Sequence, residues 1–156
     1  MVRLRLSRRL LHRFGQVGYH RRALLAEAVA WLLAARLAII FVPFPRLARR
    51  LGKFVPPAAA ASVRAGGSPE QARLAEEIGW AVTRAARYLP FKAVCLPQAI
   101  AARAMLKRRG IASVMHFGAA RGQEKPLDAH AWLDAAGVEV TGYPVAAQFT
   151  EIACFV

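Results

Sequence analysis

Two residues of this chain could form a nucleophile and its base: Cys95 and, later in the chain, His130. The thiolate is the reactive form of cysteine, and the free N–H groups in the first turn of a helix stabilise that anion. The same N–H groups would stabilise the oxyanion that forms when a thiolate attacks a carbonyl group. A neutral imidazole can take the thiol proton. The pair therefore predicts covalent acyl chemistry, with Cys95 as the nucleophile and His130 as the base.

The segments around these two residues carry the signals of a helix and a strand. A helix is expected to begin at Cys95, because Pro97 suits a first turn and Gly110, after a run of basic residues, suits a stop. His130 lies in the stretch 127–135, which reads as a strand. Alternation along that strand places His130, Trp132 and Asp134 on one face and small or apolar residues on the other.

The elements around them predict an α+β fold. Ser68, Pro69 and Gln71 form a capping-box signal before an amphipathic helix of about 20 residues. Strands are expected over 111–118, 127–135 and 138–141, with a turn at 121–126. Helices followed by an antiparallel meander are typical of the α+β class.

Charge and composition suggest two parts. The net charge is +14, and residues 1–53 carry twelve Lys and Arg against the single acid Glu27. Such a segment attracts an anionic partner. The stretch 55–67 has the Pro, Ala and Gly composition of a linker, so we expect a basic, apolar N-terminal helical segment at 1–56 and a core at 68–156. The two cysteines suit a reducing compartment, and we expect a cytoplasmic protein.

The apolar stretch 23–44 allows three interpretations. Glu27 and Arg36 fall on opposite sides of a helix, so no single polar stripe forms, and the helix is expected to be buried all round or to lie in lipid. Arg36 near the middle would cost about 2.5–3.5 kcal/mol in a spanning helix. We favour a core helix over peripheral membrane contact, and peripheral contact over spanning.

The C-terminal half resembles the B2 leader-peptide proteases of lasso-peptide biosynthesis, which have a transglutaminase-like, papain-related core. The resemblance rests on the Cys95-Leu96 opening, the helix end R-A-M-L-K-R-R-G-I, and A-H-A-W-L-D followed by G-V-E-V-T-G. The N-terminal helix ending P-F-P-R-L-A-R-R-L-G is also similar to the usual start of that family. The resemblance implies a cysteine catalytic helix packed with an antiparallel sheet.

The resemblance also implies an activity and partners. Cys95 would attack the peptide bond between leader and core of a precursor peptide, with His130 as general base and then acid. The chain has no added leader-recognition domain, so a separate B1 leader-recognition protein is expected, with the lasso macrolactam synthetase acting next. No cofactor is implied. Any ATP use would belong to a partner.

The third catalytic residue of that family, an Asp on the strand after the histidine, is missing from its place. Glu139 and Asp134 are the available substitutes, and a carbonyl group or water could also orient the ring of His130. His116 is a runner-up base, but with no carboxylate near it in sequence we interpret it as structural. Cys154 is interpreted as inert packing.

The remaining histidines, His12 and His20, are expected to face solvent or an anionic surface. No Cys, His and carboxylate spacing is typical of a metal site, so no zinc is predicted. Two other functions remain open. One is acyl transfer to an amine, as in transglutaminases, and the other is a basic, non-catalytic adaptor that binds membrane or nucleic acid. Under the protease hypothesis no nucleic-acid partner is expected.

Overall fold

The computed structural model describes residues 3–121, 127–145 and 147–156. Helices come first: α1 (Arg3–Phe41), α2 (Phe44–Leu51), α3 (Pro57–Ala65), α4 (Pro69–Ala86) and α5 (Cys95–Lys107), with a short strand β1 (Phe54–Val55) before α3. The strands β2 (Ser113–Ala120), β3 (Asp128–Ala135), β4 (Val138–Thr141) and β5 (Thr150–Phe155) follow. This order confirms the α+β class. Most of the predicted turn at 121–126 lies outside the described residues.

The ends of α4 and α5 follow their sequence signals. At the start of α4 the Ser68 hydroxyl accepts a hydrogen bond from the Gln71 N–H (3.2 Å), and the Gln71 side chain accepts one from the Ser68 N–H (3.0 Å). This reciprocal pair satisfies N–H groups that a helix start leaves free. Just after the C-terminal end of α5, Gly110 has a φ of +67°, a conformation that glycine adopts at little cost.

The strands form one antiparallel sheet with the order β1-β5-β2-β3-β4. Strands β2 and β3 pair in continuous register, with His116 opposite Trp132 and Gly118 opposite His130. The pairing of β2 with β5 contains a bulge, because Phe117 lies opposite Ala153 whereas the next residue, Gly118, lies opposite Glu151. The pairing of β3 with β4 also shifts register, between Leu133 and Asp134, so the sheet is regular between β2 and β3 and irregular on both sides of that pair.

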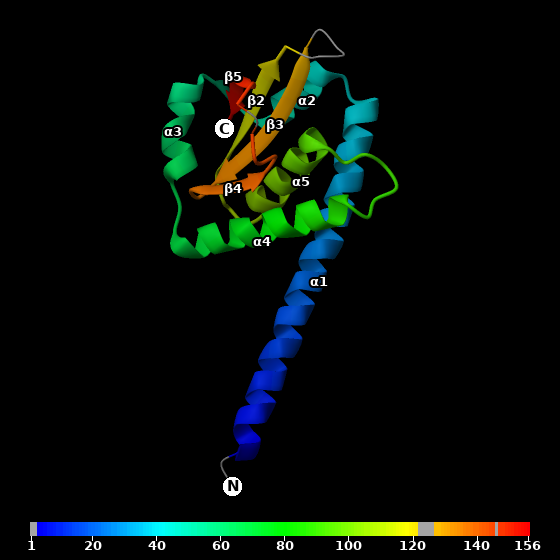
Figure 1. Ribbon diagram of the computed structural model, residues 1–156, viewed down its shortest axis with the longest axis vertical. Coiled ribbons are helices and arrows are strands. Elements are labelled where there is room, and N and C mark those ends of the chain that lie inside the picture. The colour runs from blue at the N-terminus through cyan, green and yellow to red at the C-terminus, as the bar shows by residue number, and fades with distance from the viewer. Residues whose placement is uncertain (1–2, 122–126, 146) are drawn as a thin grey trace.

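Helices cover both faces of the sheet (Figure 1). Helix α5 packs on β2, β3 and β4 and is itself covered by α1 and α4, whereas α3 contacts β2, β3 and β5 from the opposite face. The main core joins α1, α4 and α5 to the side chains of Met115 and Leu133, and a small cluster of Ala60, Val114 and Cys154 lies under α3. The two faces of the sheet thus have separate apolar cores.

Helix α1 is buried along one stripe only. Leu24, Ala28 and Leu32 are fully buried, while Leu37 and Phe41 on other faces are exposed. Of the two alternatives expected from the sequence, burial all round or a place in lipid, the first is not observed, because Leu33, Leu37, Ile40 and Phe41 are exposed. The N-terminal half of α1 projects from the body (Figure 1).

The segment 18–41 is long and apolar enough to cross a membrane. About a fifth of its best window is buried in the protein, so it combines a core-facing stripe with an exposed apolar surface. Peripheral membrane contact by residues 23–44 stays a prediction.

The predicted linker at 55–67 is in fact ordered. It contains β1, which pairs with β5, and helix α3, which starts with Pro57 in its first turn and continues through four alanines. Proline is tolerated at the start of a helix and alanine has the highest helix propensity, so a composition that suggests a linker also suits a helix. Residues on both sides of this segment share one core, and the division into parts at 1–56 and 68–156 stays a prediction.

Candidate functional site

Cys95 is the first residue of α5, as the sequence predicts. The preceding residue, Val94, has an extended backbone and provides no side-chain cap, and the first turn of α5 contains no acidic residue. The N–H groups of this turn are therefore not taken up by a capping side chain of Val94 or by a carboxylate of the turn itself. The Cys95 side chain is partly exposed. A thiol here is reachable by a substrate and lies at the end of the helix that stabilises an anion.

His130 is held in one orientation by the backbone of the loop after β4. Its Nε2 lies 2.6 Å from the carbonyl oxygen of Gly142. A carbonyl group only accepts hydrogen bonds, so Nε2 carries the proton and Nδ1 keeps its lone pair. The ring also stacks on Trp132 (centroids 5.9 Å apart) and contacts Phe149 (5.2 Å). A neutral imidazole in this tautomer can accept a proton at Nδ1.

A glycine is required at the position that orients His130. Gly142 has a φ of +86°, and a Cβ atom there would lie 2.5 Å from the Ala131 carbonyl oxygen and 2.8 Å from the Cα of Trp132. Both contacts are too short for any side chain. The close passage of this backbone past β3 is what brings its carbonyl group to the imidazole.

Neither carboxylate proposed from the sequence contacts His130. Asp134 accepts a hydrogen bond from the Tyr143 hydroxyl (2.5 Å) and faces His116, and Glu139 lines a cleft elsewhere. Of the alternatives that the sequence leaves open, the carbonyl group is the one observed. It fixes the tautomer as a carboxylate would, but it brings no negative charge to stabilise an imidazolium.

The elements that carry Cys95 and His130 are neighbours, since α5 packs on β3. Side chains alternate along β3, and Leu133 points into the core with α5. Trp132 and His130 are two residues apart, so both point to the opposite face of the sheet. No hydrogen bond joins Cys95 to His130 within residues 3–121, 127–145 and 147–156. Their catalytic pairing stays a prediction.

A second group of polar side chains lies on the face of the sheet that α3 covers, and all but Glu151 are buried. His116 Nδ1 lies 3.4 Å from Cys154 Sγ and also contacts Glu151, and the Cys154 thiol donates to Glu151 Oε1 (2.8 Å). On the other side of the ring, His116 Nε2 lies 3.2 Å from Asp134 Oδ2. Both His116 and Cys154 are almost completely buried. The imidazole is thus held between two carboxylates and a thiol.

These contacts favour the charged form of His116. Its burial disfavours the imidazolium, but the carboxylates of Asp134 and Glu151 outweigh that effect and raise the pKa of His116 above its ordinary value. Trp132 stacks on the same imidazole, with ring centroids 5.4 Å apart and planes within 4°. The two histidines therefore contact the same indole.

The structure adds polar contacts to the interpretation of His116 and Cys154 as structural residues. His116 does contact carboxylates, and Cys154 makes polar contacts in addition to packing under α3. The ligand atoms of His116, Glu151 and Cys154 all lie within 4.8 Å of one another, so a group with metal-ligand character exists that sequence spacing did not reveal. The signal that could have found it is the strand pairing, which places residues from β2, β3 and β5 on one face.

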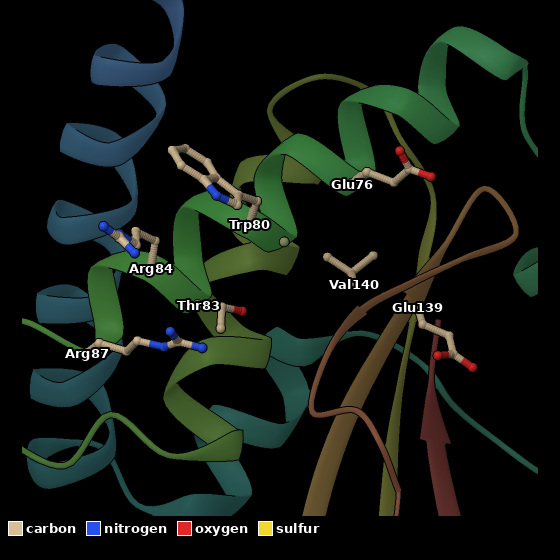
Figure 2. A pocket seen from close by; sticks show the side chains of 8 residues that line it. Glu76, Trp80, Thr83, Arg84, Arg87, Glu139 and Val140 are labelled. Carbon is tan, nitrogen blue, oxygen red and sulfur yellow. The ribbon is translucent and has the colours of Figure 1, made fainter.

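A cleft of about 400 Å³ lies away from these residues, between α4 and β4 (Figure 2). Gly79 allows the helix to approach the strand, because a Cβ atom there would lie 2.4 Å from the Val140 carbonyl oxygen. Figure 2 shows arginines and carboxylates on separate sides of the opening. The lining residues are Glu76, Gly79, Trp80, Thr83, Arg84, Arg87, Glu139 and Val140. This cleft contains neither predicted catalytic residue.

Comparison with known families gives a match over most of the chain. The family model described as the transglutaminase-like superfamily matches residues 38–154, which is most of the chain. The matched region begins near the end of α1, includes α5, and ends one residue before the end of β5. Neither the curated proteins nor the solved structures include a significant match.

Proposed function

Because this chain belongs to the transglutaminase-like superfamily, which includes cysteine proteases and acyltransferases, we propose that it is a leader-peptide protease with Cys95 as nucleophile. Its substrate would be a ribosomally made lasso-peptide precursor, cut between leader and core. The observation that carries this proposal is the placement of Cys95 as the partly exposed first residue of α5, within the matched region.

Accessibility favours Cys95 over the other cysteine. Cys154 has no exposed surface and lies in a core under α3, so a peptide carbonyl group could not reach its sulfur without local opening of the fold. The contacts of Cys154 with His116 give it a base, but a nucleophile also needs access to its substrate. Cys95 has that access.

The proposed reaction follows acyl transfer through a thioester. For His130 Nδ1 to accept the Cys95 proton, the imidazole must move toward the thiol from the sheet face opposite α5. The thiolate then attacks the leader's terminal carbonyl group, and the N–H groups of α5 stabilise the oxyanion. The imidazolium then protonates the departing amine of the core peptide. Water, deprotonated by His130, hydrolyses the thioester and releases the leader carboxylate. Before the reaction, the Gly142 carbonyl group keeps Nε2 protonated and leaves Nδ1 as the proton acceptor.

The family resemblance supplies the proposed partners. These are the precursor peptide, a separate B1 leader-recognition protein and the macrolactam synthetase that acts on the released core. A cytoplasmic location with peripheral membrane contact through the N-terminal segment suits the basic and apolar character of α1. The exposed apolar side chains of that helix would lie at the membrane surface.

Precursor cleavage with a purified B1 protein tests the proposal. Cys95→Ala and His130→Ala should each abolish release of the leader while circular dichroism remains that of the wild type. A thiol-directed alkylator, mapped by mass spectrometry, should label Cys95 before the buried Cys154. Full cleavage by Cys95→Ala, or inactivation that follows labelling of Cys154 alone, would remove Cys95 from the reaction.

The pairing with His130 has its own test. If His130 deprotonates the thiol, alkylation of Cys95 at neutral pH should be slower in His130→Ala than in the wild-type protein. Equal rates in both proteins at every pH would show that His130 is not the base.

The product distinguishes the other functions. An acyltransferase would join the leader carboxyl group to an added amine, and mass spectrometry would show a conjugate in place of a free acid. A non-catalytic adaptor would bind anionic vesicles or nucleic acid in a salt-sensitive manner and would be indifferent to alkylation of Cys95.

A further inference from the structure

We propose that His116, Cys154 and Glu151 form a binding site for a zinc-like divalent cation, with Asp134 as the partner of the histidine ligand. This site is independent of the proposed protease activity. Imidazole nitrogen, thiolate sulfur and carboxylate oxygen are the three ligand types that zinc takes in proteins. Here one atom of each type lies within 4.8 Å of the others.

The distances suit a tetrahedral ion with a small adjustment. Ligand lengths of about 2.3 Å for sulfur and 2.0–2.1 Å for nitrogen place the two atoms about 3.5 Å apart around a tetrahedral centre. Cys154 Sγ and His116 Nδ1 are 3.4 Å apart. Glu151 lies closer to both than an ion would allow and would need to withdraw by about 1 Å. Its side chain is partly exposed, so it has room to move.

The sheet fixes the other two ligands rigidly. His116 on β2 and Cys154 on β5 are directly opposite in the antiparallel register, and both are almost completely buried. A pair held by main-chain hydrogen bonds on adjacent strands keeps its geometry without help from a metal. The site is therefore largely preformed.

The bulge in β5 is what adds the third ligand. Glu151 and Cys154 are three residues apart, and in a regular strand residues at an odd separation point to opposite faces. The register shift between Phe117 and Gly118 accommodates one extra residue on β5 and returns Glu151 to the face of Cys154. Bulges commonly re-aim a side chain at a functional site. Here the bulge converts a two-residue contact into a three-ligand set.

The second nitrogen of His116 has the partner that metal-bound histidines usually have. Nε2 lies 3.2 Å from Asp134 Oδ2, and Asp134 is in turn held by the Tyr143 hydroxyl. A carboxylate on the far nitrogen fixes the ring and makes the ligating nitrogen more basic. Nε2 faces Asp134 at ion-pair distance, and Nδ1 is the nitrogen that faces Cys154 and Glu151 and would bind the ion. Three protein ligands leave a fourth position for water.

Metal binding by the full-length protein tests the site without any activity assay. Metal-free protein is titrated with Zn²⁺ against a chromophoric chelator, and with Co²⁺ to detect thiolate-to-cobalt charge transfer in the near ultraviolet. We expect one equivalent of each metal and a charge-transfer band. Cys154→Ser should abolish the band, whereas Cys95→Ser, which removes the only other cysteine, should leave stoichiometry and band unchanged.

Two milder variants test the remaining assignments. Glu151→Gln changes a partly exposed side chain and should weaken Zn²⁺ binding about tenfold or more, and Asp134→Asn should weaken it about 10–100-fold through the histidine. Unchanged affinity in Glu151→Gln would overturn the three-ligand set. Failure of the wild-type protein to bind Zn²⁺ below millimolar concentration, or loss of the cobalt band in Cys95→Ser, would overturn the site itself. Circular dichroism of each variant identifies any loss caused by unfolding.

Discussion

Substitution of Gly118 by alanine should disturb both histidines through the indole that they share. Gly118 lies opposite His130 on one side and opposite Glu151 on the other. A Cβ atom at this position would lie 2.8 Å from Cζ3 and 3.0 Å from Cη2 of Trp132, so the indole must move by several tenths of an ångström. Trp132 is 6% exposed and stacked on His116 and His130, which leaves the ring little space.

Two opposing effects determine how much Gly118→Ala changes the free energy of unfolding. Overpacking a filled core costs about 1–3 kcal/mol, while replacing glycine with alanine in a strand gains about 0.5–1 kcal/mol in backbone entropy. We expect the first effect to dominate and the free energy of unfolding to fall by about 1–2 kcal/mol. In urea, this corresponds to a midpoint lower by roughly 0.5–1 M.

Equilibrium unfolding in urea, followed by far-ultraviolet circular dichroism, measures this loss. Near-ultraviolet circular dichroism of the native state reports the displaced indole. Gly18→Ala is the matched control, because no atom lies within 4 Å of its added Cβ and the position is helical. That variant should gain about 0.5–1 kcal/mol. If Gly118→Ala is as stable as the wild type and keeps its near-ultraviolet spectrum, the indole is not confined as we argue.

Other substitutions test the packing of the helices. Glu27→Gln removes a carboxylate that accepts two hydrogen bonds from Arg109 (2.6 and 3.1 Å), and should cost about 1–3 kcal/mol in urea unfolding at neutral pH. The hydrogen bonds from Arg109 lower the pKa of Glu27 in the folded protein. The difference in unfolding free energy between the wild type and Glu27→Gln should therefore be full above the ordinary glutamate pKa and should shrink as the pH falls through the lowered pKa of the folded state. A difference that does not depend on pH would contradict this role of Glu27. Ser68→Ala removes the helix cap and should lower the unfolding free energy by about 1 kcal/mol, measured in the same way, whereas no change would mean that the cap is dispensable. Leu32→Ala should lower the thermal unfolding midpoint through a loss of about 2–5 kcal/mol, while the exposed Leu37→Ala should change it little; equal effects would show that the buried stripe is misassigned.

Local signals allowed much of the fold to be predicted. The capping box at Ser68 and the stop at Gly110 depend on neighbouring residues only, and both are observed. The strand around His130 is also local, because alternation and flanking turn residues define it. Helix α3 was not predicted, because alanine and proline suit a linker and a helix start equally well. The ordered structure of this segment also depends on the pairing of β1 with β5, which lie far apart in the sequence.

The buried group around His116 could not be predicted, for a different reason. Its members come from three strands, and the inclusion of Glu151 depends on a bulge that the sequence of β5 does not announce. The orientation of His130 depends on a backbone carbonyl group, which no search for a carboxylate can find. The placement of Cys95, in contrast, was correct because the start of a helix is a local property.

The contact between His130 and the Gly142 carbonyl group has a consequence for how this site tolerates genetic change. An orienting aspartate is lost when its codon mutates, but every residue carries a carbonyl group, so no single-codon change deletes this acceptor. Its weakness lies in the path of the chain: at a φ of +86° and so close to β3, only glycine fits. Selection would therefore act on the absence of a side chain, and the residue that orients His130 would be recognised in relatives as an invariant glycine.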